Sequence, residues 1–181
     1  MNPRLSEAEL PGRIWQELQR APHDKHHEWR TPVLATVDPQ GLPDARTVVL
    51  RHTDPNARTL VCFTDARSPK CAELREQPGA MLVFWSQRLG WQLRVQARAV
   101  VQTEGPEVDA AWTRVGASPA ASDYLAARAP GSALMPHEPA ASHHHLALLR
   151  LQVLAIDWLE LHRDGHRRAR LVDGGVNWLT P

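Results

Sequence analysis

The sequence predicts one mainly β domain, an antiparallel barrel of Greek-key character with peripheral helices. Three observations predict this class. Runs rich in β-branched residues recur from residue 33 onward, the turns between them are short and rich in Asp, Pro and Gly, and helical periodicity is confined to short stretches. No strand–helix alternation of the kind that builds a parallel sheet is visible. We expect about six to eight strands in a single domain over residues 1–181.

Composition narrows the class of protein. Twenty-one Lys and Arg against twenty Asp and Glu leave a net charge of +1, which lacks the basic footprint of a nucleic-acid binder. Cys62 and Cys71 are too few for a disulfide framework or a thiolate metal site, and this favours a reducing compartment. Residues 1–21 alternate charged and apolar side chains, so no signal peptide or membrane span is predicted. We expect a cytoplasmic protein without nucleic-acid or membrane partners.

An N-terminal helix is expected over about residues 6–21. Two starts are open, because Ser6 with Glu9 forms a capping box, while Pro11 suits the first position of a slightly later helix. Apolar residues at helical spacing give the helix one face to lay on the protein. Pro22 marks its end.

The first strands follow in series. Residues 33–37 and 45–52 are β-prone, and residues 38–41 between them have turn chemistry, which predicts an antiparallel hairpin. A second turn at 54–56 leads to a third run at 59–64. We expect these three strands to form a meander rather than a βαβ unit.

The rest of the chain alternates short helices with long strands. Ser68 is a preferred cap residue before Pro69 at a first helical position, which predicts a short helix that Pro78 ends. Two helical stretches, 106–115 and 120–129, predict a helical insertion over about residues 106–130. The remaining strands are expected at 80–85, 91–101, 146–161, 167–172 and 177–179.

The segment between Thr64 and Lys70 is the sharpest candidate site. A strand ends there, a helix begins at Ser68, and Arg67 and Lys70 flank its first turn. Free backbone N–H groups and a partial positive charge at a helix N-terminus suit a phosphate. The alternative is that Ser68 only caps the helix while both cations are solvated.

Two further features lie on strands. Arg46 and Arg51 fall on opposite faces of one strand by alternation, so one of them can face inward. A guanidinium suits phosphate through its planar fork, and the strand's own N–H and C=O groups can read a heterocycle where the strand is unpaired. Gln92 lies in another strand, where its amide can bond a ring carbonyl or nitrogen. The alternative is two exposed arginines and a polar strand residue.

The order of these pieces resembles the FMN-binding core of the pyridoxamine 5'-phosphate oxidase family. The similar elements are, in order, residues 46–51, 63–64, 68–70, 73–74, Pro78, 84–85 and 91–95, the last of which contains Gln92. The resemblance covers most of residues 30–181. It implies an FMN-binding split β-barrel. It also implies a homodimer that holds two flavins at its interface, each contacted by both chains.

The resemblance implies roles for individual residues. Arg46 and Lys70 hold the FMN phosphate together with the helix start at Ser68. Gln92 contacts the isoalloxazine. The residues implied to line the ribityl chain and ring are Thr47, Val48, Val49, Arg51, Phe63 and Thr64. Those implied to reach a flavin from the C-terminal half or the partner chain are Ser132, Trp158 and Arg170, with Arg168 as an alternative to Arg170.

The sequence departs from the family pattern at the residues that bind the substrate and, to a smaller extent, at the cofactor site. Oxidases of the family bind the vitamin phosphate with a Tyr, Arg and Ser set and a late Arg-x-His motif. Here residues 112–119 lack the tyrosine and a clear arginine, only Ser122 lies near its expected place, and residues 166–168 read His-Arg-Arg. At the cofactor site Pro69 replaces a usual Arg and Arg51 a usual Lys.

The leading hypothesis is therefore an FMN-dependent oxidoreductase that acts on a small reduced substrate. Activity as a true pyridoxamine 5'-phosphate oxidase is less supported. No acid or base is nominated as catalytic, and Arg51 is the best candidate beside the flavin ring. The alternative is a flavin-binding or electron-carrying module without pyridoxamine phosphate oxidase activity.

The histidines do not predict a metal site. His162 and His166 are four residues apart, a spacing that chelates on a helix, but their segment is predicted as strand and turn. Residues 143–145 are consecutive histidines at the entry of a strand. We expect no metal.

Overall fold

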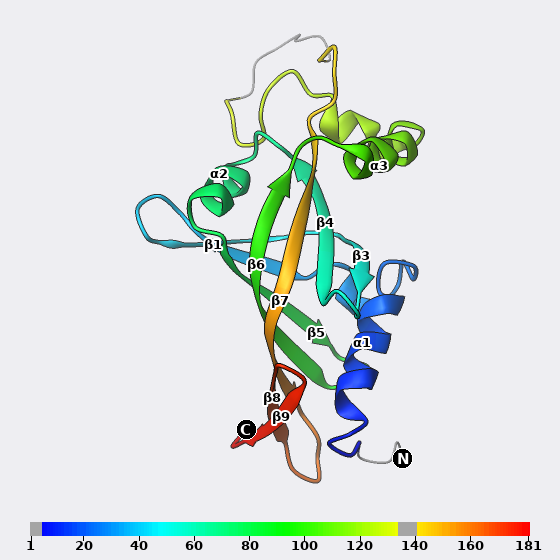
Figure 1. Ribbon diagram of the computed structural model, residues 1–181, viewed down its shortest axis with the longest axis vertical. Helices are drawn as coiled ribbons and strands as arrows, with labels where there is room; N and C mark the ends of the chain where they lie inside the picture. The colour runs from blue at the N-terminus through cyan, green and yellow to red at the C-terminus, as the bar shows by residue number, and fades with distance from the viewer. Residues whose placement is uncertain (1–4, 134–140) are drawn as a thin grey trace.

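A single antiparallel sheet organises the computed structural model, which describes residues 5–133 and 141–181 (Figure 1). Within these residues the strand order is β2-β1-β5-β6-β7-β4-β3, and β8 and β9 continue from β7. No pairing joins β2 to β3, the two ends of this path, so the barrel is split. The strands are β1 (Val33–Val37), β2 (Pro43–Thr47), β3 (Leu50–Asp54), β4 (Thr59–Asp65), β5 (Gly79–Ser86), β6 (Trp91–Gln102), β7 (Leu146–Glu160), β8 (Arg167–Val172) and β9 (Gly175–Leu179).

The fold class is confirmed as mainly antiparallel β with peripheral helices. The helical elements are α1 (Leu10–Arg20), α2 (Pro69–Glu76), α3 (Pro106–Gly116) and the 3-10 turns η1 (Glu28–Arg30) and η2 (Pro119–Tyr124). The described residues contain nine strands, slightly more than expected. No helix among them is long and apolar enough to cross a membrane.

Strands β6 and β7 form the spine of the molecule (Figure 1). They pair from Trp91 opposite Glu160 to Gln102 opposite Leu148, with one irregularity after Gln96. The first half of β7 also pairs with β4, and its second half pairs with β8. Because β7 serves both halves of the sheet, it connects the region around α2 and α3 to the C-terminal hairpin.

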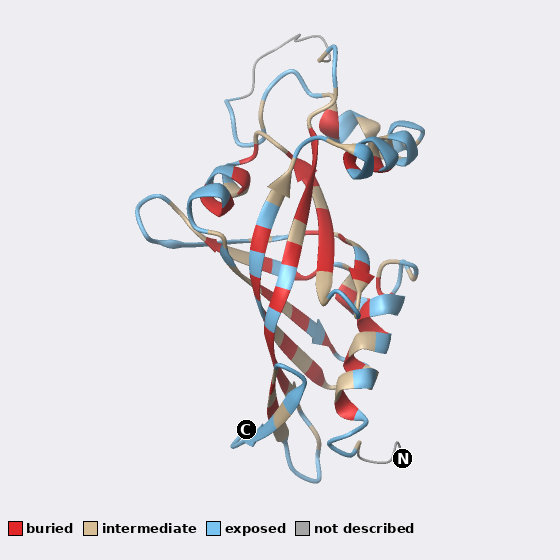
Figure 2. Ribbon diagram, viewed as in Figure 1, coloured by how far each residue is buried: buried red, intermediate tan, exposed pale blue. Residues whose placement is uncertain are grey.

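Two apolar clusters fill the structure, and buried and exposed residues alternate along the long strands (Figure 2). The larger cluster lies under α1, which contributes Leu10, Ile14 and Leu18. Its aromatic members include Trp29, Phe84, Trp91 and Trp158. The smaller cluster lies between α3 and the sheet and comprises Val61, Val108, Ala111, Tyr124, Leu146 and Leu148.

Helix α1 uses the later of the two predicted starts. It begins at Leu10, with Pro11 in its first turn. Ser6 and Glu9 do make contact, since the Ser6 backbone N–H and hydroxyl both donate to Glu9 Oε2, over 2.8 and 2.7 Å. That contact closes a turn before the helix, so the start near residue 6 is wrong.

The strand predicted at 45–52 is broken. The pairing of β2 with β1 ends at Thr47, and β3 begins at Leu50. Between them the Val48 N–H donates to the Pro32 carbonyl over 3.0 Å. Strands β2 and β3 therefore lie at opposite ends of the sheet path, and the predicted three-strand meander is wrong. Local β-propensity does not reveal the crossing, because both sides of it are β-prone.

The helical insertion is shorter than predicted. Helix α3 matches its prediction, but the second stretch is a 3-10 turn that ends at Tyr124 instead of a helix over 120–129. Few apolar residues recur at helical spacing after Tyr124, and Pro130 and Gly131 oppose helix continuation. The segment after η2 is therefore held by tertiary contacts.

Candidate functional site

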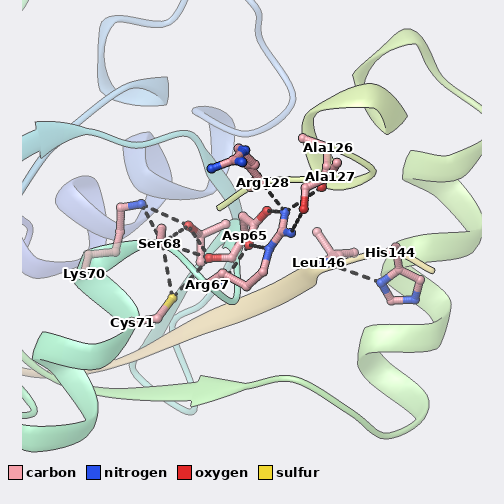
Figure 3. A network of polar contacts seen from close by, with 11 residues as sticks. Asp65, Arg67, Ser68, Lys70, Cys71, Ala126, Ala127, Arg128, His144 and Leu146 are labelled. Carbon is pink, nitrogen blue, oxygen red and sulfur yellow. Dashed lines mark hydrogen bonds and ion pairs between the residues drawn. The ribbon is translucent and has the colours of Figure 1, made fainter. Parts of the chain in front are cut away.

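The predicted phosphate segment gathers hydroxyl groups around one ammonium group, that of Lys70 (Figure 3). Lys70 Nζ donates to Ser68 Oγ over 3.0 Å and to Thr64 Oγ1 over 3.1 Å. Ser68 and Thr64 are buried. Ser68 occupies the N-cap position of α2 but makes no side-chain capping bond; its hydroxyl donates instead to the Asp65 carbonyl over 2.8 Å. The prediction that Ser68 caps the helix with its side chain is wrong, and its hydroxyl accepts a hydrogen bond from Lys70.

Burial is the main cause that holds the pKa of Lys70 below its ordinary value, and the positive charge of nearby Arg46 acts in the same direction. A partly buried ammonium whose hydrogen-bond partners are neutral hydroxyls is under-compensated. An anion beside it is therefore favoured. The electrostatic effect of Arg46 also shows that the structure brings together the two cations assigned to the phosphate by resemblance.

Arg46 is held from β2 against α2. Its Nη1 donates to Thr36 Oγ1, and its Nη2 pairs with Asp44 and, over 3.2 Å, with Glu73 Oε2. Glu73 is only 4% exposed, so Arg46 binds a buried carboxylate on α2. Sequence reasoning gave Glu73 no role at the site, although it is a polar residue beside the apolar Cys71 and Leu74 in the same short helix.

Arg67 clamps a loop instead of facing a ligand (Figure 3). Its Nε and Nη2 donate to the two carboxylate oxygens of Asp65 over 3.0 and 2.7 Å. The same guanidinium donates to three carbonyls, those of Ala126, Ala127 and Arg128, over 2.9–3.1 Å. The hydrogen bond to Asp65 raises the pKa of Arg67. The solvated alternative is wrong for Arg67, because it pairs with Asp65 and with three carbonyls that lie about sixty residues away in sequence.

Arg51 lies in β3 at an irregularity of its pairing with β4, where the register shifts between Leu50 and His52. Its guanidinium carbon lies 5.6 Å from the centre of the Phe63 ring. Its Nε is buried and has no hydrogen-bond partner among residues 5–133 and 141–181. A buried, unpartnered donor on a cation is costly unless a ligand satisfies it.

The single tyrosine of the sequence, Tyr124, is next to Arg51. Burial, as the main cause, raises the pKa of the Tyr124 hydroxyl, and a hydrogen bond with Arg51 opposes that shift. Sequence reasoning sought a tyrosine in residues 112–119 and missed this one, because η2 brings it back under α3. Its signal was that it is the only Tyr in the chain.

A groove of about 590 Å³ opens beside Arg51, between α3 and η2 on one side and β3, β4 and β7 on the other. Its floor is apolar and includes Val61, Phe63 and Leu148. Most ionisable side chains of its lining are basic residue types. They are Arg51, Arg114, Arg150, His23 and His52, together with one carboxylate, Glu107, whose Oε1 accepts from Arg150 over 2.5 Å.

The late arginines lie on the outer face of the sheet with the even-numbered residues of β6. Arg94 and Arg168 both donate to Asp157 Oδ2, over 2.6 and 2.8 Å. Arg170 Nη2 donates to Gln96 Oε1 over 2.7 Å. Gln92 is on this face too, since it lies two residues from Arg94 along β6. Both candidate arginines therefore share a face with Gln92, and the choice between them stays open.

Trp158 is placed in the core. It is 0% exposed, and its ring meets Trp91 and Trp178 edge-on at 5.4 and 6.3 Å. A ring enclosed in this way has no face for a flavin, so the structure argues against the role predicted for Trp158. Alternation explains it, because Trp158 falls on the inward face of β7.

The other predicted contacts are on loops and at the strand break. Val48 is buried, Val49 is half-buried and Thr47 is exposed. Ser132 is exposed, and its N–H donates to the Ala129 carbonyl over 3.1 Å. The segment before it passes close to α2, since a Cβ on Gly131 would lie 3.9 Å from Pro69 Cγ. Ser132 thus lies at the end of the loop that Arg67 clamps.

Comparison with known proteins places this site in a family. Residues 13–103 match the model described as pyridoxamine 5'-phosphate oxidase, FMN-binding domain. Among similar proteins, the pyridoxine/pyridoxamine 5'-phosphate oxidases of Chromohalobacter salexigens and Azorhizobium caulinodans are 46% and 39% identical over 44% and 57% of this chain. The matched segments span only 35% and 48% of those two proteins.

Solved structures share the fold of this chain. A pyridoxamine 5'-phosphate oxidase-related FMN-binding protein from Nostoc punctiforme has a TM-score of 0.75 at 22% identity, covering 98% of this chain and 100% of its own. PhzG from Burkholderia lata, in complex with tetrahydrophenazine-1-carboxylic acid, has a TM-score of 0.71 at 20% identity, covering 99% and 95%. A heme-binding protein from Mycobacterium smegmatis has a TM-score of 0.56 at 18% identity, covering 93% and 59%. With its matched FMN-binding domain and split-barrel fold, the chain belongs to the pyridoxamine 5'-phosphate oxidase family.

Proposed function

We propose that this chain binds FMN and works as an FMN-dependent oxidoreductase on a small reduced substrate in the cytoplasm. The observation that carries the proposal is Lys70, a partly buried cation whose hydrogen-bond partners are the hydroxyls of Ser68 and Thr64 and whose neighbour is Arg46. This donor set suits a phosphate monoester, which accepts several hydrogen bonds and carries negative charge.

The residues present fit FMN at both ends. Lys70, Ser68 and Arg46 would hold the phosphate. At the ring end, the buried Nε of Arg51 is a donor without a partner in the part of the chain that the structure describes. The break in strand pairing at Val48 and Val49 leaves strand backbone beside it. When bound, FMN supplies the redox chemistry, and the protein supplies binding, orientation and electrostatics.

Arg51 has the charge and position to act on the reacting end of the site. Arg51 lines the groove, with its guanidinium against Phe63 and beside Tyr124. A fixed cation in a partly buried place stabilises negative charge without reorganisation. We assign Arg51 the role of orienting an anionic or electron-rich group next to the cofactor.

The groove suggests the kind of substrate. Its apolar floor with Phe63 suits a flat ring, and its rim with Arg114 and His52 suits an anionic substituent. The substrate proposed here is therefore a small, flat, anionic molecule. Pyridoxamine phosphate is one member of this class. We do not assign it as the substrate, because the residues with which oxidases of the family bind its phosphate have no clear match in this chain.

The outer face of the sheet supports a homodimer. Trp85, Val100 and Leu154 are 46%, 59% and 50% exposed, and they share the sheet with Gln92 and the paired arginines of β6 and β8. Large apolar side chains on a flat face favour a protein contact. We propose that a second copy covers this face, so that each FMN lies at the interface.

An electron-carrying or flavin-binding module is the second candidate. The observation that favours it is the composition of residues 112–119, where the family's vitamin-phosphate tyrosine and arginine have no clear match. In this candidate the groove beside Arg51 holds no dedicated substrate.

Anaerobic mixing separates the two candidates. The FMN-loaded protein is mixed with pyridoxamine phosphate, with other small amines and with reduced nicotinamide nucleotides, and the absorbance of oxidised flavin is followed. The oxidoreductase predicts that one of these bleaches the flavin, and that Arg51→Met slows the bleaching by roughly tenfold or more. A carrier keeps its flavin oxidised in every mixture, and that result removes the enzyme proposal.

A further inference from the structure

The phosphate cradle, defined here as Arg46, Ser68, Lys70 and Thr64, contains two carboxylates close to its cations. Glu73 Oε2 lies 3.2 Å from Arg46 Nη2, and Asp44 pairs with the same nitrogen. Both carboxylates pair with Arg46 before any ligand binds. A cradle for a dianion normally keeps its positive charge uncompensated, so this pairing calls for a physical explanation.

Glu73 is fixed firmly in its place. It lies on α2 with 4% exposure, and its Oε2 accepts from Thr36 Oγ1 over 2.5 Å. The Thr36 hydroxyl is buried as well and accepts from Arg46 Nη1. Glu73, Thr36 and Arg46 thus form a closed triangle between α2, β1 and β2. Rotation of the guanidinium away from this triangle would leave a buried carboxylate unpaired, which is costly.

The triangle leaves Arg46 only part of its hydrogen-bonding capacity. A guanidinium has five N–H donors, and both Nη atoms of Arg46 already donate to Thr36, Asp44 and Glu73. Its Nε–H has no hydrogen-bond acceptor among the described residues. Arg46 is held in a fixed orientation, but its positive charge is already paired with the carboxylates of Asp44 and Glu73.

The charge of Glu73 also reaches Lys70. Among the influences on the pKa of Lys70, which burial lowers, the carboxylate of Glu73 acts in the opposite direction and favours the charged ammonium. Glu73 therefore interacts with both cations of the cradle. A carboxylate that stabilises both cations before binding repels the phosphate after binding.

We infer that Glu73 is a positioning residue that holds Arg46 in the cradle and, by its charge, limits how tightly the cradle binds a phosphate dianion. FMN is then an exchangeable ligand of this chain. The inference rests on the proposed FMN function. It concerns the strength of binding, so its failure leaves that function intact.

The test compares FMN with riboflavin, which lacks the phosphate, in fluorescence titrations of the full chain. Glu73→Gln keeps the shape and the acceptor oxygen and removes the charge. Its FMN affinity is expected to rise roughly threefold to thirtyfold, its FMN dissociation rate to fall, and its riboflavin affinity to stay unchanged. Glu76→Gln is the matched control, because it makes the same charge change at an exposed position of the same helix, and it leaves both affinities unchanged.

Other outcomes overturn the inference. If Glu73→Gln binds FMN with unchanged or weaker affinity, or if the FMN and riboflavin affinities change together, Glu73 is only a structural anchor. Should this variant not fold, Asp44→Asn removes the other charge on Arg46 from a side chain that is 49% exposed, and the same tightening for FMN alone is required of it. Wild-type protein that binds neither flavin removes the proposed function together with the inference.

Discussion

Lys70 Nζ donates to Ser68 Oγ over 3.0 Å. The hydroxyl of Ser68, at the N-cap of α2, therefore accepts from a cation and not from a backbone N–H of the helix. The ammonium is thereby fixed at the start of the helix before any ligand arrives. Fixing a long side chain in advance lowers the entropy that binding would otherwise cost. The first two predictions follow from this contact.

Lys70→Ala is expected to weaken FMN binding by about 1.5–3 kcal/mol, the range for a hydrogen bond to a charged group. Riboflavin affinity is expected to change little. The measurement is a fluorescence titration of both ligands, with Lys25→Ala as control, because Lys25 is the other lysine of the chain and is exposed. Unchanged FMN affinity in Lys70→Ala contradicts the phosphate assignment.

FMN affinity is expected to fall on the alkaline side earlier than an ordinary lysine would allow. The pKa of Lys70 is lowered, mainly by burial. A bound phosphate favours the charged ammonium and raises that pKa, so affinity is full below the lowered pKa and is lost as pH rises through it. A titration series across pH checks this, with riboflavin as the reference. An FMN profile that parallels the riboflavin profile contradicts the prediction.

Glu17 is expected to make the fold sensitive to acid. It is fully buried on α1, where its carboxylate meets Arg13 over 2.6 Å, Arg88 over 3.0 Å and His27 over 2.9 Å. Burial alone would raise its pKa, but the His27 hydrogen bond and the arginines together hold it below the ordinary value. The stabilisation is therefore present above the unfolded-state pKa of Glu17 and is lost as pH falls through the lowered, folded-state pKa.

Glu17→Gln tests this contact. We expect it to reduce the free energy of unfolding by about 1–3 kcal/mol at neutral pH, since the arginine partners are partly solvated. The deficit is expected to shrink as the pH is lowered in urea unfolding. Glu104→Gln, at an exposed position, serves as control. A deficit independent of pH shows that the charge of Glu17 is not the cause.

Gly90 is expected to resist substitution. Its φ is +67°, and a Cβ there would lie 2.7 Å from the Leu161 carbonyl oxygen. Gly90→Ala therefore combines backbone strain with a clash at the end of the β6–β7 spine, and we expect a loss of about 2–4 kcal/mol in urea unfolding. Gly41→Ala shares the positive φ of +81° but meets no atom within 4 Å, so about 1 kcal/mol is expected there. Equal losses in the two variants contradict the clash.

Much of the fold was predictable from local pattern. Strands β5 and β6 match their predicted bounds within about two residues, because they alternate cleanly and Gly90 marks their turn. The phosphate segment was visible for the same reason, since Thr64, Ser68 and Lys70 are close in sequence. Their contacts require no long-range information.

The features that the sequence did not predict depend on contacts between residues far apart in the chain. The crossing at Val48 and the core position of Trp158 depend on which sheet edge and which face each strand occupies. The clamp made by Arg67 joins residues about sixty positions apart, and the triangle of Glu73 joins two hairpin strands to a helix. Single residues of these types look like ordinary surface or core residues in the sequence.

Equilibrium gel filtration tests the central claim most directly. The wild-type chain is run in buffer containing FMN, and flavin absorbance and molecular mass are recorded across the protein peak. The account predicts excess flavin that travels with the protein at the mass of a dimer, and less excess for Lys70→Ala. A protein peak that carries no flavin above the running buffer contradicts it.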